Sequence, residues 1–434
     1  MIVVKFSGSA TANAEKIKTA AKIINSETSC RYVVVSSPGK NLPDDIKITD
    51  MLYILHSKFQ SREGYNEMLK KIAEQFMSII LELGITFDID REIAILKEDL
   101  LAGESADYIA SRGEFIMAKI FAKMLNWEFV DAAKIIFFDA DGKLEDARTF
   151  ATASEVLSKY EHAVIPGFYG SLPNGKIKTF PRGGGDITGA IIARAVKADL
   201  FEKCTANTNF FSADPSIVSE PKIIQTLTYS EALEINYTGI KIIHDEAAFL
   251  LKDTEIPTKV RNINTPSSEG TLITPTKDLT GNITVCIAGR RNFNIIHIEK
   301  FGINRFYGFG EKLFGIFARY NAPCEHCLSG IHKISVVVKT PMFDLKRNEI
   351  LREIESIIQP DSLSLERDLS IILTIGEGTG RTYGILDKIA SSLAHEKINI
   401  RMLDQGSDDL NVILGVSDKD YDAAIRTLYH AMIV

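Results

Sequence analysis

The sequence predicts an α/β protein with a mostly parallel sheet sandwiched by helices, followed by two ferredoxin-like βαββαβ modules. Over the first two thirds of the chain, short apolar runs rich in β-branched residues alternate with helical stretches, which is typical of a parallel sheet covered on both faces. The last third contains two strand–helix–strand units, an internal repeat of roughly seventy residues. Between these parts, residues 264–282 are rich in Pro, Ser, Thr and Gly, which predicts a domain boundary and divides the chain into residues 1–277 and 278–434.

Within residues 1–277, the apolar runs predict buried strands joined by long helical regions. The strands are expected at residues 2–6, 32–35, 134–138 and 163–168. The helical regions are expected at residues 49–83 and 111–125. Parallel strands need long crossover connections, and these helical regions can provide them.

Within residues 278–434, the first module is expected at about 294–360 and the second at about 366–434, with a further strand near 283–290. The first unit shows a strand at 293–300, a helix at 311–322 and a strand at 333–339. The second shows a strand at 369–376, a helix at 384–398, a strand at 408–416 and a final helix near 421–432.

Composition narrows the class of protein. The 434 residues are 45% apolar and 25% charged, as in an ordinary globular protein, and the net charge of −7 argues against nucleic-acid binding. Apolar runs are too short for a signal peptide or a membrane span, so a cytoplasmic protein is expected. Cys324 and Cys327 have CxxC spacing around His326, which suits a metal or redox site, but there is no second such pair. Ordinary packing of these cysteines is favoured, and no metal centre held by the protein is predicted.

The first segment with possible chemistry is VVKFSGSA at residues 3–10, a strand followed by a turn of small residues. Backbone N–H groups in such a turn can approach an anion closely, and Lys5 at the strand end can place an ammonium against phosphate oxygens. A strand with a Ser/Gly turn is also common without any ligand. The segment is not a Walker A loop.

Two further segments place charged residues at helix starts. In RGGGD, Arg182 and three glycines precede a helical pattern, so free N–H groups and a guanidinium can grip an anion together. Asp186 follows the glycines, where a helix cap is as good an interpretation as an active-site role. Glu114, in SRGE, lies in what we expect to be a first helical turn, where the helix dipole alone favours a carboxylate.

Taken together, these segments resemble the amino acid kinase superfamily, and specifically the aspartate kinases. The resemblance rests on segments that occur in the family's order: VVKFSGSA, SSPGK followed by ITD, SRGE, PGFYG, RGGGDITGA, ADLFEKCTANTNFFSADP and GIKIIHDEA. YNAPCEHCLSGIHKISVVV and INIRMLDQGSDDLNVILGV resemble the first and second ACT modules of the same family. The resemblance implies an amino acid kinase-type sheet followed by ACT domains. It also implies transfer of a phosphoryl group from ATP, with Mg²⁺, to the side-chain carboxylate of aspartate.

The resemblance also implies roles for individual residues. Catalytic roles fall on Lys5, Arg182 and Asp186. Substrate binding falls on Ser36, Thr49, Glu114, Arg182, Gly183 and Gly184. Nucleotide binding falls on Lys5, Gly8, Ser9, Thr205, Phe211, Asp214 and Lys241. This chemistry needs positioning and charge neutralisation rather than covalent help from the protein.

The chain departs from the family pattern at several positions. Ser7 replaces a glycine, Gly185 replaces the serine of RGGSD, and Ala206 replaces an aspartate. Asn209 and Phe211 also differ from the usual glycine and tyrosine, and Arg112 stands in SRGE where many members have another residue. Two alternatives to an active aspartate kinase therefore stay open: a kinase for another acidic amino acid, and a catalytically impaired regulatory paralogue.

Regulation is implied by the ACT modules. Effector binding is expected at Glu325, His326, Ser329 and Gly330, in the turn after the first ACT helix. Residues 399–411, with Gln405, Gly406 and Ser407, match the second module. The family expectation is feedback by lysine, alone or with threonine, on the first step towards lysine, threonine and methionine. Family ACT modules pair across a dimer, which implies a homodimer and possibly a tetramer, although such pairing can be purely structural.

Overall fold

The computed structural model describes residues 1–434 except 43, 207–208, 266–267, 279–282 and 406–408, and it contains two compact units. The first comprises Met1–Phe210, Gln225–Asn236 and Lys241–Lys277, and the second comprises Phe211–Ile224, Tyr237–Ile240 and Asp278–Val434. In the described ranges, no helix is long and apolar enough to cross a membrane. Gly406 and Ser407, expected in the second ACT module, lie outside the described residues.

The first unit is built on an eight-stranded sheet with the order β3-β4-β2-β1-β7-β9-β10-β8. Neighbouring strands are parallel except for β9 and β10, which confirms the predicted mostly parallel sheet. The strands are β1 (Ile2–Phe6), β2 (Cys30–Val35), β3 (Glu128–Phe129), β4 (Ala163–Pro166), β7 (Leu200–Thr205), β8 (Thr226–Thr228), β9 (Thr258–Asn262) and β10 (Thr271–Thr274). A separate hairpin joins β5 (Tyr169–Ser171) to β6 (Ile177–Thr179).

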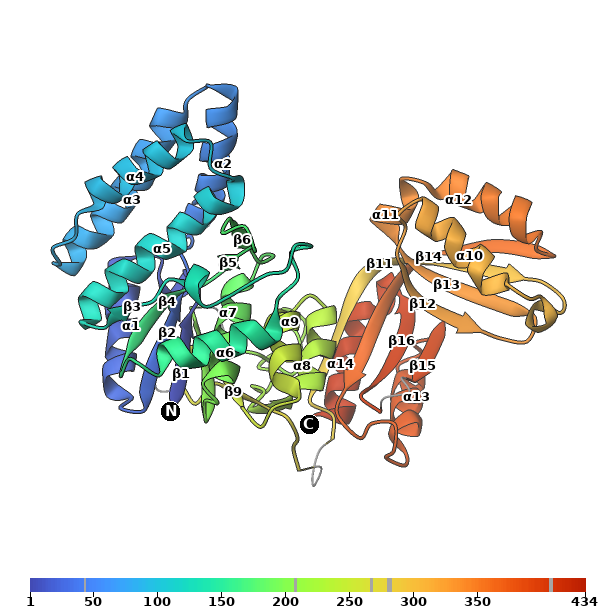
Figure 1. Cartoon of the computed structure of the whole chain (residues 1–434). Helices are drawn as coiled ribbons and strands as arrows, with labels where there is room; N and C mark the ends of the chain where they lie inside the picture. The colour runs from blue at the N-terminus through green and yellow to red at the C-terminus, as the bar shows by residue number, and fades with distance from the viewer. Residues whose placement is uncertain (43, 207–208, 266–267, 279–282, 406–408) are drawn as a thin grey trace. The chain divides into compact units, whose positions relative to one another are not determined.

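Helices cover both faces of this sheet (Figure 1). On one face, Val4 and Phe6 of β1 share a core with the apolar faces of α1 (Ala14–Ser26), α3 (Tyr65–Leu83) and α5 (Ala106–Leu125). On the other, α7 (Gly184–Ala195) packs on β1 and β7, between α6 (Asp146–Leu157) and α9 (Asp245–Lys252). The remaining helices are α2 (Ile48–Ser61), α4 (Ile89–Leu101) and α8 (Tyr229–Tyr237). The sandwich of helices around the sheet is therefore as expected.

Strand β1 lies where the strand order of the sheet reverses. From β1 the chain goes to β2 and β4 on one side, and later to β7 and β9 on the other. In open α/β sheets, ligands bind outside the carboxyl ends of the strands at such a reversal. The topology therefore points to the ends of β1 and β7, next to the N-terminus of α7.

One predicted strand is wrong. Residues 134–138 do not form a strand: a 3-10 helix at Ala132–Lys134 is followed by isolated bridges from Phe137 and Phe138. Ile135 and Ile136 are fully buried, so the apolar run correctly marked burial. Burial alone does not distinguish a strand from an irregular buried segment. The helical region predicted at 49–83 is two helices, because the chain turns at Arg62 and Gly64, both left-handed.

The second unit contains a six-stranded antiparallel sheet with the order β12-β13-β11-β14-β16-β15. Its strands are β11 (Cys286–Glu299), β12 (Cys324–Ser329), β13 (Lys333–Lys339), β14 (Ser362–Ile375), β15 (Met402–Gln405) and β16 (Asn411–Ser417). Its helices are α10 (Phe309–Arg319), α11 (Thr340–Asp344), α12 (Arg347–Glu353), α13 (Ile385–His395) and α14 (Tyr421–Met432). The first half reads βαββαβ from β11 to β14, as predicted. The second half reads βαββα from β14 to α14, and the start of β11 provides its remaining strand next to β14.

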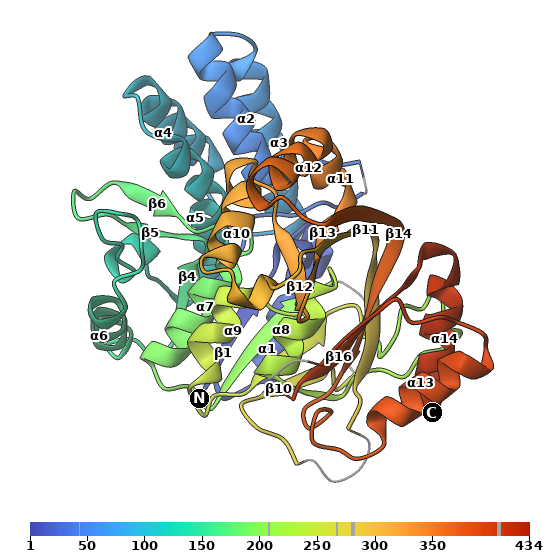
Figure 2. The same ribbon diagram turned by 90° about the vertical axis from the view of Figure 1, so that its right-hand side faces the viewer.

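The long strands β11 and β14 serve both halves of the second unit. They pair from Cys286↔Ile375 at one end to Glu299↔Ser362 at the other. The first half packs α10 and α12 over one core, and the second packs α13 and α14 over another. Figure 2 shows α13 and α14 side by side next to β16.

Candidate active site

The first unit contains a cleft of about 1530 Å³ where the topology points. Twelve residues predicted from the sequence line it: Lys5, Gly8, Ser9, Ser36, Thr49, Glu114, Arg182, Gly183, Gly184, Asp186, Thr205 and Lys241. Among the described lining residues, nine are Lys or Arg and five are Asp or Glu. A cationic cleft in a chain with a net charge of −7 is suited to an anionic ligand.

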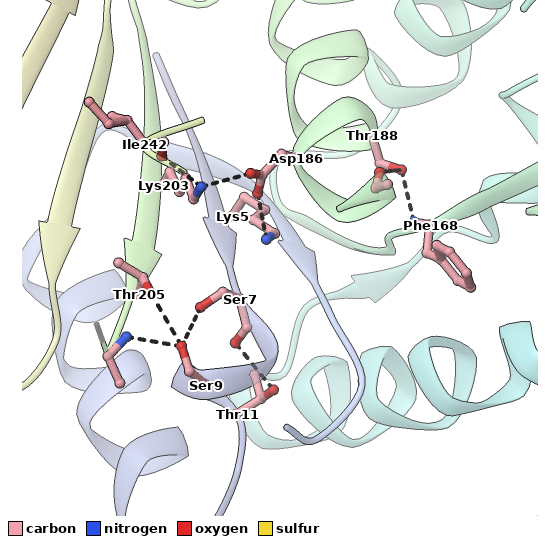
Figure 3. Close-up of polar contacts among 12 residues, drawn as sticks. Lys5, Ser7, Ser9, Thr11, Phe168, Asp186, Thr188, Lys203, Thr205 and Ile242 are labelled. Atoms are coloured by element: carbon pink, nitrogen blue, oxygen red, sulfur yellow. Dashed lines mark hydrogen bonds and ion pairs between the residues drawn. The ribbon is translucent and has the colours of Figure 1, made fainter. Parts of the chain in front are cut away.

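The turn after β1 brings backbone and hydroxyl groups to the cleft. Gly8 packs against Gly39, whose N–H donates to the Gly8 carbonyl at 2.8 Å, and a Cβ on Gly39 would lie 2.5 Å from that oxygen. Ser7 has φ −71°, so a side chain causes no backbone strain there. Its hydroxyl lies 2.9 Å from that of Ser9, which lies 3.3 Å from that of Thr205 (Figure 3).

Ala206, which stands where the family has an aspartate, donates its backbone N–H to Ser9 Oγ at 3.1 Å. Its carbonyl accepts from Asn264 Nδ2 at 3.0 Å. The backbone at this position is therefore held by neighbouring polar groups although the carboxylate is missing. The hydroxyl of Ser7 is a further polar group close to Ser9.

Asp186 is the centre of a buried charge cluster at the start of α7. Its Oδ1 lies 2.6 Å from Lys5 Nζ, and its Oδ2 lies 2.7 Å from Lys203 Nζ (Figure 3). Burial opposes ionisation of this carboxyl, but Lys203 and Lys5 together hold its pKa well below its usual range. Asp186 is therefore an ion-pair partner as well as a residue of the first helical turn.

Sequence reasoning missed Lys203, which lines the cleft and also donates to the carbonyl of Ile242 at 2.8 Å. Lys5 and Lys203 are register partners in the adjacent parallel strands β1 and β7. Register partners in neighbouring strands face the same side of a sheet. The available signal was a lysine near the end of each of two strands, VVKF and FEKC, but using it required knowing that these strands pair.

The three glycines allow the start of α7 to approach its neighbours closely. Gly183 has φ 93°, in the left-handed region that favours glycine. A Cβ on Gly184 would lie 2.5 Å from Phe180 Cβ, and one on Gly185 would lie 2.8 Å from Ser36 Oγ. Side chains at these positions would displace the N-terminus of α7, which lines the cleft. The N–H groups of Gly184 and Asp186 donate to the carbonyls of Pro181 and Gly183 at 2.9 and 2.8 Å, and the positive end of the helix dipole lies at this wall.

Glu114 presents a buried carboxyl on another wall of the cleft. It lies in the middle of α5 and not in a first helical turn, so that expectation is wrong, because the helix already begins at Ala106. Thr49 donates to its Oε1 at 3.4 Å, and Thr49 is itself 2.5 Å from the hydroxyl of Ser37. Burial raises the pKa of Glu114 to about 7, although hydrogen bonds from Ser37 and Thr49 oppose the rise. Its other oxygen, Oε2, is buried and has no hydrogen-bond partner in the described part of the chain. A buried acceptor without a partner, on a residue that lines the cleft, is suited to a ligand's donor group.

Arg112, the other departure near this carboxyl, is buried among rings. Its guanidinium lies 4.3 Å from the ring centre of Tyr108 and 4.4 Å from that of Phe115, and it donates to Ser111 Oγ at 2.8 Å. It supports α5 from inside the protein.

The two outer cations are exposed and paired with nearby carboxylates. Arg182 is 87% exposed, and its Nη2 lies 2.9 Å from Asp50 Oδ1 on α2. Lys241 Nζ lies 3.6 Å from Asp245 Oδ2. Both side chains border the cleft and can reorient towards a ligand, because exposed pairs of this kind are weak.

The remaining predicted residues belong to the second unit. Asp214 accepts from the backbone and hydroxyl of Ser216, and Phe211 forms an isolated bridge with Ile223. The turn expected at Glu325, His326, Ser329 and Gly330 is wrong for most of its length, because Cys324–Ser329 is strand β12, paired with β13. Glu325 accepts from the Tyr237 hydroxyl at 2.7 Å, a neighbour that the sequence did not indicate.

The cysteines of the CxxC pair lie on β12, Cys324 partly buried and Cys327 exposed. A bulge between Cys324 and His326 breaks the strand alternation, so Cys324 pairs with Val338 and Cys327 with Val336, which share one face of β13. The preference for ordinary packing fits Cys324 better than Cys327, because Cys327 is exposed. Within the described ranges, no group of three or more His, Cys, Asp or Glu could hold a metal ion.

Known proteins match the chain over nearly its whole length. The amino acid kinase family model matches residues 1–262, and an ACT domain model matches residues 372–432. Aspartokinase 3 of Bacillus subtilis (strain 168) is 30% identical over 99% of this chain and 98% of its own. The structure of Clostridium acetobutylicum aspartate kinase, described as an allosteric enzyme, matches 99% of both chains at 39% identity and a TM-score of 0.94.

E. coli aspartokinase III, solved with aspartate and ADP, shares the fold with a TM-score of 0.75 at 22% identity, and the match covers 100% of both chains. The matches, the sheet with its cationic cleft and the βαββαβ repeat all point the same way. The chain therefore belongs to the aspartate kinases of the amino acid kinase family, which phosphorylate aspartate and carry regulatory ACT domains.

Proposed function

We propose that the cleft of the first unit binds the two substrates in two parts. Lys5, Gly8, Ser9, Thr205 and Lys241 take the phosphates of ATP, and Ser36, Thr49, Glu114, Arg182, Gly183 and Gly184 take aspartate. The observation that carries this division is the unpaired, buried Oε2 of Glu114, which can accept from the ammonium of an amino acid. The ammonium groups of Lys5 and Lys203 provide the opposite charge for phosphate.

In this proposal, the side-chain carboxylate of aspartate attacks the terminal phosphorus of ATP, a new O–P bond forms, and the bond to the ADP oxygen breaks. The carboxylate is already ionised near neutral pH, so no protein base has to remove a proton. Lys5 neutralises charge on the transferred group, and the N–H groups at the start of α7 add positive potential. Thr49 and Glu114 orient the amino acid so that its carboxylate faces the phosphorus.

The residues present fit a nucleotide that brings its own metal ion. Asp186 has an ammonium on each oxygen, so its carboxylate is not available as a metal ligand. Mg²⁺ commonly keeps most of its ligands as water and substrate phosphates. Mg²⁺ bound to the ATP phosphates would shield their charge from the incoming carboxylate.

For the nucleotide, Phe211 and Asp214 stay proposed contacts. The proposed regulatory region is residues 278–434, which would form a homodimer, possibly within a tetramer. We propose lysine as the effector, because E. coli aspartokinase III has also been solved with lysine and aspartate in a T-state. Threonine is the second candidate. We also propose that the enzyme is cytoplasmic and catalyses the first step towards lysine, threonine and methionine. Feedback by these amino acids is consistent with that place in the pathway.

The main test is ADP release with Mg-ATP and a panel of acidic amino acids. We expect turnover with aspartate and loss of turnover in Lys5→Ala. Turnover with another acid alone would show that Gly185 has changed the substrate, and no turnover from a folded enzyme would identify a regulatory paralogue. Full activity in Lys5→Ala would contradict the proposed phosphate site.

The effector site is tested separately, with lysine and threonine titrated against activity. Glu325→Gln removes the negative charge on β12 and keeps the shape of the side chain. If Glu325 binds the ammonium of lysine, half-inhibition should need about 10-fold more lysine, because charged hydrogen bonds contribute about 1.5–3 kcal/mol. Unchanged activity of Glu325→Gln without effector serves as the control. Inhibition that is equally strong in Glu325→Gln would place the effector elsewhere.

A further inference from the structure

Two buried lysines share a single carboxylate at the floor of the cleft. Lys5, Lys203 and Asp186 have side chains that are 6%, 11% and 7% exposed. By comparison, Arg261 and Lys277 in the described part of the first unit each have a carboxylate to pair with, Glu202 and Glu231 respectively. At the cleft, two cations to one anion leave an excess of positive charge in a poorly hydrated place. Burying a charge is costly unless it is paired, so this excess is suited to an arriving anion.

The geometry assigns different tasks to the two lysines. Lys203 has a second acceptor, the carbonyl of Ile242, so its ammonium is fixed from two sides. For Lys5, Asp186 Oδ1 is the hydrogen-bond acceptor that the structure gives. Asp186 therefore stands between a fixed ammonium and one that can turn to phosphate while it keeps its partner (Figure 3).

The sheet register explains why a carboxylate is needed between the two lysines. Lys5 and Lys203 are directly paired in β1 and β7, and neighbouring strands lie about 4.8 Å apart. Two ammonium groups that project from paired positions on the same face of the sheet repel each other, and a carboxylate bound to both offsets the repulsion. Gly189 lets α7 lie close enough for this, because a Cβ there would be 2.6 Å from the Phe201 ring and 3.3 Å from Lys5 Cβ.

We propose that Lys203 is a positioning residue for phosphoryl transfer, which fixes Asp186 so that this carboxylate holds the Lys5 ammonium towards the transferred phosphoryl group. Because two lysines share one aspartate, the floor of the cleft also has one positive charge in excess, which is suited to the negative charge of a phosphate. This inference rests on the proposed role of Lys5 in phosphate binding. If Lys203 only joined β7 to the segment around Ile242, a neutral hydrogen-bond donor would be enough. That role would not require Lys203 to share the carboxylate that holds Lys5.

The test compares variants that remove the charge with one that keeps it. Lys203→Met removes the ammonium, and Lys203→Gln also keeps a hydrogen-bond donor. We expect both to lower kcat by about 10- to 100-fold and to leave KM for aspartate within about threefold. Lys203→Arg should recover at least part of the loss, since a guanidinium can still hold the carboxylate. Lys277→Gln is the matched control for losing a buried cation: it should lower the melting temperature while kcat per folded enzyme stays at the wild-type value.

A double-mutant cycle with Asp186→Asn decides whether Lys203 acts through Asp186. If it does, Lys203→Gln should reduce kcat no further in the Asp186→Asn background. Additive losses would overturn the positioning role, as would wild-type kcat in folded Lys203→Gln. If Lys203→Met does not fold, the Gln variant alone carries the test. Loss of activity in Lys5→Ala beside full activity in Lys203→Gln would reject this inference and leave the proposed function standing, whereas full activity in Lys5→Ala would reject the proposed function itself.

Discussion

Gly185 of α7 and Ser36, just after β2, are so close that a Cβ on the glycine would lie 2.8 Å from the serine hydroxyl. The same Cβ would lie 3.0 Å from Lys5 Cε. The Ser36 hydroxyl therefore lies beside the place where a serine at position 185 would add its own. The departure from RGGSD removes one hydroxyl and leaves that of Ser36 beside the same position in the cleft.

Gly185→Ser is therefore expected to reduce activity, although it restores the sequence of the family. The added Cβ would push Ser36 and Lys5 away from their places, and misplacing groups by under an ångström can cost about 10-fold in kcat/KM. The fold should tolerate the change, because serine side chains move easily and glycine is a poor helix former. Steady-state kinetics with aspartate and a thermal melt would separate the two effects.

Combining Gly185→Ser with Ser36→Ala provides the control for the crowding argument. Removing the Ser36 hydroxyl makes room for the new side chain, so the double variant should recover part of the activity lost in Gly185→Ser. Higher activity in Gly185→Ser alone would contradict the crowding and favour a missing hydroxyl as the defect.

Aspartate binding should weaken as the pH falls below about 7. The pKa of Glu114 is about 7, raised from 4.5 chiefly by burial, so a falling pH neutralises the carboxylate that is proposed to hold the substrate ammonium. KM for aspartate should rise through this range more steeply than kcat falls. Calorimetry in buffers of different ionisation enthalpy offers an independent check, because binding near pH 7 should release protons from Glu114. Binding of aspartate without proton release would contradict the proposed role of Glu114.

Glu114→Gln should stabilise the enzyme above pH 7 while it impairs aspartate binding. A carboxyl whose pKa rises on folding favours the neutral form, so its stabilising contribution is present below pH 4.5 and is lost as the pH rises through about 7. The shift corresponds to at most about 3 kcal/mol, which the permanently neutral amide would recover at pH 8. Thermal melts at pH 5 and pH 8 should show a gain only at pH 8. An equal gain at both pH values would point to packing instead of charge.

The sequence predicted those parts of the site that lie within single segments. Lys5 at the end of β1 and Asp186 at the start of α7 could be found because strand, turn and helix signals surround them. Lys203 could not, because its role depends on the pairing of β7 with β1, which brings together residues far apart in the chain. The raised pKa of Glu114 depends on how α5 is buried, which local spacing does not determine. The error at residues 134–138 has the same origin, since an apolar run reports burial and not backbone conformation.

The ion pair of Arg182 with Asp50 competes with the proposed grip of Arg182 on the substrate carboxylate. The pair joins the loop before α7 to α2, with Nη2 and Oδ1 2.9 Å apart and Arg182 87% exposed. Asp50→Asn should therefore lower KM for aspartate by a few-fold, because the guanidinium no longer has to leave a charged partner. Stability should change by less than about 1 kcal/mol, as expected for an exposed pair. Arg182→Lys is the matched variant: it keeps the charge, loses the bidentate fork and should raise KM by about 10-fold. If Asp50→Asn raised KM instead, Asp50 would be orienting Arg182 for the substrate and not competing with it.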